Sequence, residues 1–207
     1  DLLAAQVRAC LEDERQGYHL LAVIGASGSG KSSVVRAGLL PVLRRMTRAG
    51  SGPQGLQPVF ADAIFVFTPT ARPLEALAVA LTCDGDSLGE TARLLDDLAR
   101  DPRSLHLAAA RMAYAYKASH VLLVVDQFEE LFSLCRDEQQ RQAFLDNLLY
   151  AAQAAGPAVV VIALRADFYA QCAPYASLRA ALAHRQLFIG AMNASELRQA
   201  IEEPARC

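Results

Sequence analysis

A glycine-rich stretch near the N-terminus contains residues whose types and spacing suit phosphate chemistry. It follows the pattern G-x-x-x-x-G-K-[ST], with Gly25 and Gly30 as the two glycines, followed by Lys31 and Ser32. Glycines let the backbone turn tightly and bring its N–H groups up to a phosphate. The lysine can reach the β- and γ-phosphates, and the serine hydroxyl can ligate Mg²⁺. The pattern predicts a phosphate-binding loop. The residues predicted to contact the nucleotide are Gly25, Ala26, Ser27, Gly28, Ser29, Gly30, Lys31, Ser32 and Ser33.

A second motif lies about 95 residues further along the chain. The apolar run Val121–Val125 ends in Asp126, a Walker B pattern in which a buried strand carries a carboxylate to its tip. Ser32 and Asp126 are therefore the predicted Mg²⁺ residues. Glu129 and Glu130 follow, and either could orient and deprotonate the attacking water. The alternative is that both only place negative charge at the start of a helix, where the helix dipole favours it.

A third candidate is Arg165, which follows the apolar run Ala158–Leu164. An arginine at a strand tip could contact the γ-phosphate and stabilise charge in the transition state. The alternative is an ion pair with Asp167 or another carboxylate.

Strand and helix patterns alternate along the chain, which predicts an α/β fold with a largely parallel sheet. Ligands in such sheets bind beyond the carboxyl ends of the strands, so the three motifs should share one site. The predicted strands are Leu20–Ile24, near Phe60–Phe67, Val121–Val125, Ala158–Leu164 and Leu187–Ile189. The predicted helices are Leu2–Leu11, one opened by Ser32 and interrupted at Pro41, Pro73 to about Leu81, Glu90–Arg100, Ser104–Lys117, Glu138–Ala155 and Glu196–Glu203.

Composition restricts the class of protein. The chain has 207 residues, 53% hydrophobic and 20% charged, which indicates a globular domain. Its formal net charge of −2 gives no global attraction to nucleic acid or anionic lipid. No apolar run approaches the roughly 18 residues of a membrane span. The five cysteines are scattered, which favours reduced thiols in a cytoplasmic protein, and the four histidines lack metal-ligand spacing.

The three motifs together resemble the novel STAND NTPase group. The resemblance rests on Gly25–Ser33 with the following run Arg36–Pro41, on Asp126–Phe132, and on Leu164–Tyr169. These relatives are signal-transduction P-loop ATPases, often found in large bacterial proteins with WD-repeat propellers. The resemblance implies an AAA+-like, ASCE-type P-loop core, a three-layer αβα sandwich with sheet order 5-1-4-3-2. It also implies ATP and ADP as ligands, Mg²⁺, slow hydrolysis, and a switch between ADP-bound and ATP-bound states with assembly in the active state.

The resemblance also implies roles for single residues. AAA+ relatives carry a glutamate directly after the Walker B aspartate, but this chain has Gln127 there. The catalytic base must then be Glu129 or Glu130, and the NACHT-type acidic pair slightly favours Glu130. The implied catalytic set is Glu129, Glu130 and Arg165.

The same resemblance predicts that residues 1–207 are the P-loop core of a larger multidomain protein, with a lid region starting at about residue 191. Lid, sensor and effector domains would lie elsewhere in the same polypeptide, and nucleotide-dependent self-assembly would need them. We expect these 207 residues alone to leave the adenine largely wet, to bind ATP weakly and to stay monomeric.

Three other functions share features of this sequence. The loop is also similar to that of ABC transport ATPases, but no Ser-Gly-Gly-Gln-type signature follows it. A small-molecule kinase would need an arginine-rich lid, and no convincing one is present. A catalytically dead nucleotide-binding scaffold is the third alternative. The guanine-reading Asn-Lys-x-Asp pattern is absent, which favours ATP.

Overall fold

The computed structural model describes residues 2–12, 17–49, 59–60, 62–82, 88–153 and 155–190. The predicted helix Glu196–Glu203, the loop Gly50–Pro58 and the lid region from about residue 191 lie outside these ranges. Within them, no helix is long and apolar enough to cross a membrane.

Five parallel strands form one sheet: β1 (Leu20–Gly25), β2 (Ile64–Phe67), β3 (Val121–Val125), β4 (Ala158–Arg165) and β5 (Gln186–Ile189). Their order is β2-β3-β4-β1-β5, which confirms the predicted order 5-1-4-3-2. β1, β3 and β4 are central and nearly continuously apolar, as expected for strands buried on both faces.

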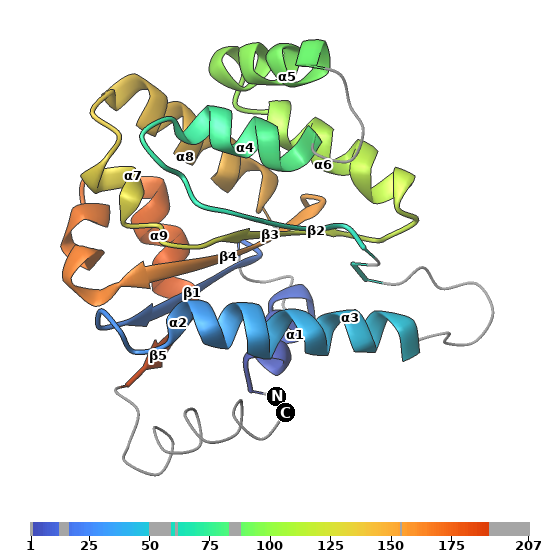
Figure 1. Ribbon diagram of the computed structural model, residues 1–207, viewed down its shortest axis with the longest axis vertical. Coiled ribbons are helices and arrows are strands. Elements are labelled where there is room, and N and C mark those ends of the chain that lie inside the picture. The colour runs from blue at the N-terminus through green and yellow to red at the C-terminus, as the bar shows by residue number, and fades with distance from the viewer. Residues whose placement is uncertain are drawn as a thin grey trace.

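Helices cover both faces of the sheet, which gives the predicted three layers (Figure 1). One face carries α4 (Pro73–Thr82), α6 (Ser104–Ala115), α8 (Glu138–Ala151) and α9 (Ala176–His184), and α5 (Leu88–Arg100) packs on the outer side of these helices. The other face carries α1 (Leu2–Glu12) and the helix made of α2 (Lys31–Ser33), a π-helical segment (Val34–Leu39) and α3 (Leu40–Ala49). Each face of the sheet has its own hydrophobic core, and the side chains of β1 alternate between them. Ala22 and Ile24 pack into one core, and Leu21 and Val23 pack into the other.

The π-helical segment replaces the predicted interruption at Pro41. The Leu40 N–H reaches back five residues to the Val35 carbonyl, and the helix then continues through Pro41 as α3. A proline inside a helix lacks one N–H, so the chain changes its hydrogen-bond pattern just before the proline instead of ending there.

Two elements were not predicted from the pattern, a 3₁₀ helix (Ala166–Cys172) and α9. A short helix, α7 (Glu130–Ser133), begins at Glu130, where the alternative for the two glutamates placed a helix start. The second strand is also shorter than predicted and starts at Ile64, and just before it the Ala63 N–H donates to the Phe60 carbonyl.

Candidate phosphate-binding site

The glycine-rich loop connects β1 to α2 at the carboxyl edge of the sheet. Gly28 and Gly30 have φ of 75° and 85°, the left-handed region that glycine adopts without steric cost. Gly25 has a different constraint. A Cβ atom on Gly25 would lie 2.6 Å from the Ile189 carbonyl oxygen and 2.6 Å from Ser29 Oγ. The sequence pattern thus reflects two needs, a turn and a close approach to β5.

Lys31 lies folded back over this loop. Its Nζ donates to the carbonyl oxygens of Gly25, at 2.9 Å, and Ala26, at 2.7 Å, and the residue is only 8% exposed. The ammonium group is therefore held over the loop by backbone acceptors. A phosphate in the loop would offer this cation a charged acceptor, which makes a stronger hydrogen bond than a neutral carbonyl.

Asp126, at the tip of β3, is buried and has hydrogen bonds to both carboxylate oxygens. Its Oδ1 accepts from Ser32 Oγ at 2.7 Å and from the Gln127 N–H at 3.0 Å. Its Oδ2 accepts from Arg36 Nε at 2.8 Å. The structure thus brings together Ser32 and Asp126, which were predicted to hold the metal. Sequence reasoning assigned no role to Arg36, although it lies in the run that carries the family resemblance.

The backbone after Asp126 is locally strained. Gln127 has φ of 51°, a conformation that few non-glycine residues adopt. Such outliers persist only where the surroundings impose them, and they concentrate at functional sites. Here the turn connects β3 to α7.

A cavity of about 390 Å³ lies between the loop and the tips of β3 and β4. Its lining brings together residues of all three predicted motifs. These residues are Ser27, Gly28, Gly30, Lys31, Ser32, Ser33, Asp126, Gln127, Glu129, Ala163 and Arg165. Glu130 is not part of this lining. Burial, followed by the charges of Glu129 and Asp126, raises the pKa of Glu130 above its usual value.

Arg165 makes contacts that connect it to both acidic neighbours. Its backbone N–H donates to Glu129 Oε2 at 3.2 Å. Its guanidinium group pairs with Asp167, with an Nη2–Oδ2 distance of 2.7 Å, and lies 5.3 Å from the centre of the Phe168 ring. The hydrogen bond to Asp167 is the main cause of the raised pKa of Arg165. The ion pair proposed as the alternative is therefore present, and the same side chain borders the cavity.

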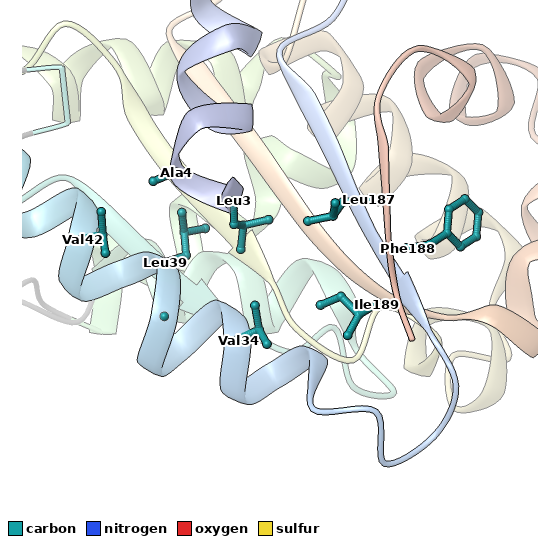
Figure 2. Close-up of a pocket in the computed structure, with 9 residues that line it drawn as sticks. Leu3, Ala4, Val34, Leu39, Val42, Leu187, Phe188 and Ile189 are labelled. Atoms are coloured by element: carbon teal, nitrogen blue, oxygen red, sulfur yellow. The ribbon is translucent and has the colours of Figure 1, made fainter. Parts of the chain in front are cut away.

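A second cavity, of about 320 Å³, lies beside the first turns of the same helix and is lined by carbon-rich side chains (Figure 2). The lining residues are Leu3, Ala4, Val34, Gly38, Leu39, Val42, Leu187, Phe188 and Ile189. Leu3, Val34 and Ile189 lie around its centre, whereas Phe188 points away from them (Figure 2). Sequence reasoning missed this cavity because its walls come from α1, the phosphate-loop helix and β5, which are far apart in the chain.

The fold and the site together define a P-loop NTPase. The family model described as Novel STAND NTPase 1 matches residues 2–207, so the chain belongs to that family. A search of curated proteins found no match.

The solved structures that are similar in fold include the following three. The ADP form of the Aeropyrum pernix ORC2 protein has a TM-score of 0.65 and 14% identity, and the match covers 98% of this chain and 51% of that one. The same protein in its ADPNP-ADP complexes has a TM-score of 0.56 and 13% identity, and the match covers 98% of this chain and 50% of that one. Drosophila ORC bound to DNA has a TM-score of 0.55 and 19% identity, and the match covers 97% of this chain and 43% of that one. This chain thus spans about half the length of these proteins or less, and the likeness shows the fold alone.

Proposed function

We propose that this domain binds ATP and ADP, hydrolyses ATP slowly with Mg²⁺, and acts as a nucleotide-dependent switch in signal transduction. The observation that carries the proposal is the cavity of about 390 Å³ in which the loop, Asp126, Glu129 and Arg165 meet. The adenine nucleotides named for the Aeropyrum pernix ORC2 structures, which share this fold, support ATP and ADP as the ligands.

The phosphates would lie in the loop, at the start of the helix formed by α2 and the π-helical segment. Backbone N–H groups from the loop and the positive end of that helix favour an anion there. Lys31 would exchange its carbonyl acceptors for phosphate oxygens. Arg165 would contact the γ-phosphate after leaving Asp167, an exchange that costs little because both side chains are more than a third exposed.

The Ser32–Asp126 pair fits Mg²⁺, since a hydroxyl and a carboxylate oxygen are the hard ligands this ion prefers. When bound, the ion would neutralise charge on the β- and γ-phosphates. Glu129 and Glu130 remain the candidate bases. The lining of the cavity favours Glu129, whose carboxylate is also held by the Arg165 N–H.

The apolar cavity in Figure 2 offers a seat for the base of the nucleotide. Ser33 lines the first cavity and Val34 the second, so both cavities lie beside the first turns of the same helix, and we propose that the base extends from the phosphate loop towards the second. Adenine has apolar faces that such walls can bury.

The switch would follow from the exchange of partners. In this structure Lys31, Arg165 and Asp126 all pair with protein groups that a metal–nucleotide complex would replace. We propose that lid, sensor and effector domains of the same polypeptide read this exchange, and that nucleotide-dependent assembly requires them.

Lys31→Ala tests the phosphate site. We expect ATP binding, measured by isothermal calorimetry, to be lost, because Lys31 is the cation held directly over the loop. Arg93→Ala, at an exposed position on α5, is the matched control and should bind like the wild type. Unchanged ATP affinity in a folded Lys31→Ala variant would refute the phosphate-loop assignment.

A further inference from the structure

Arg36 makes an unusual contact for a residue that is mostly exposed. Its side chain is 54% exposed, yet its Nε lies 2.8 Å from Oδ2 of Asp126, whose side chain is 3% exposed. A buried carboxylate is costly unless a cation or several hydrogen bonds satisfy it. Arg36 supplies a cation to Oδ2 of this buried carboxylate.

The position of Arg36 follows from the helix that starts the phosphate site. Arg36 lies four residues after Ser32, so both project from the same side of the helix and contact the same carboxylate. The Ser32 hydroxyl and the Gln127 N–H donate to Oδ1, and Arg36 donates to Oδ2. Arg36 lies within the π-helical segment Val34–Leu39, and π-helical turns occur frequently at functional sites.

Oδ2 is also the oxygen left for a metal ion or a metal-bound water. Ser32 can ligate a metal through a lone pair while its hydrogen stays on Oδ1. A metal would bring a second positive charge to Oδ2, next to the guanidinium group of Arg36. Two cations on one carboxylate oxygen repel each other, and the exposed arginine is free to leave.

We propose that Arg36 is a positioning residue that holds the Asp126 carboxylate in the metal-free site and competes with the divalent metal for Oδ2. The inference rests on the proposed function, because it takes Ser32 and Asp126 as the metal pair. Arg36 thus raises the metal concentration at which the site is half occupied. It keeps the carboxylate aligned without metal and lowers the metal affinity of the site.

The test uses Mn²⁺ as a spectroscopic substitute for Mg²⁺. Free Mn²⁺ is measured by electron paramagnetic resonance in titrations of the 207-residue chain, with and without ADP. Arg36→Gln removes the competing charge, and Arg36→Lys keeps a charge without the guanidinium geometry. Arg45→Gln, at an exposed position on α3, is the matched control. ADP binding in EDTA is measured in parallel with a fluorescent ADP.

We expect Arg36→Gln to bind Mn²⁺ about two- to fivefold more tightly than the wild type, the range that a partly exposed ion pair supports. Arg36→Lys should lie between the two, and Arg45→Gln should match the wild type. In EDTA, Arg36→Gln should melt up to about 4 °C lower, and saturating Mn²⁺ should remove this difference. A role in stability alone would lower the melting temperature without changing the Mn²⁺ affinity.

Two results would overturn the inference. If the wild type binds ADP in EDTA but Arg36→Gln has equal or weaker Mn²⁺ affinity, the competition is refuted and the proposed nucleotide function stands. If neither protein binds Mn²⁺ or ADP, both the inference and the proposed function fail.

Discussion

Gly25→Ala should destabilise the domain through one contact between the phosphate loop and β5. Gly25 is the last residue of β1, and it pairs with Arg165 on one side and Ile189 on the other. The added methyl group would lie 2.6 Å from both Ser29 Oγ and the Ile189 carbonyl oxygen. The serine side chain can rotate away. The carbonyl cannot move unless the backbone of β5 moves with it.

The magnitude follows from that displacement. Overpacking of this kind costs about 1–3 kcal/mol. For a chain of this size, each kcal/mol lowers the melting temperature by roughly 2–4 °C. Gly25→Ala should therefore lower the melting temperature by roughly 2–12 °C.

Gly38→Ala is the matched control. Its new Cβ would have only Val34 Cγ1 within reach, at 4.0 Å, and Gly38 lies in a helical segment. There the change should stabilise the fold by about 0.4–1 kcal/mol, since alanine loses less backbone entropy than glycine. Thermal unfolding of both variants is followed by circular dichroism. If Gly25→Ala melts within 1 °C of the wild type, or if both variants fall equally, the close approach is not the reason for glycine at this position.

Two further predictions concern catalysis and pH. Glu129→Gln should slow ATP turnover by roughly 10²-fold while ATP still binds, and Glu130→Gln should slow it less, because only Glu129 lines the cavity; slowing in Glu130→Gln alone would reverse the assignment. Burial lowers the pKa of His19 and of His120, whose rings pack edge to face with centroids 5.8 Å apart. The unfolded chain therefore takes up more protons than the fold below about pH 6.5, and stability should fall as the pH drops below that value. Urea midpoints of a His19→Asn/His120→Gln variant should lose this dependence, those of the exposed His184→Gln should keep it, and equal slopes in all three would refute it.

The sequence predicted those parts of the fold that depend on local pattern. The runs Val121–Val125 and Ala158–Leu164 are long, apolar and bounded by turns, so their strands were placed within one residue. The strand order came from the family resemblance, because periodicity cannot tell which strands pair. α9 and the 3₁₀ helix were missed because both are short, and the apolar face of α9 consists of only Leu178, Ala181 and Leu182.

In the candidate site, too, the sequence predicted the features that depend on local pattern and missed those that depend on tertiary contacts. The loop could be predicted because each of its residues has a backbone or charge requirement within a short stretch. Asp126 could be predicted because a strand leads directly to it. The pairing of Arg36 with Asp126 joins residues 90 positions apart, and no local pattern predicts such a contact. The apolar cavity is likewise formed only by tertiary packing.

The position of β1 in the sheet has a consequence for the order in which the chain folds. β1 precedes every other strand in sequence, yet its two neighbours are β4 and β5, the last two strands described. Leu20 pairs with Val160 and Ala22 with Gln186, across more than half of the chain. During synthesis, β2, β3 and β4 can pair while β1 still has only one or no partner, and long-range parallel pairing of this kind is slow. The phosphate loop is synthesised early, but β1, which leads into it, gains its second neighbouring strand only when β5 has left the ribosome.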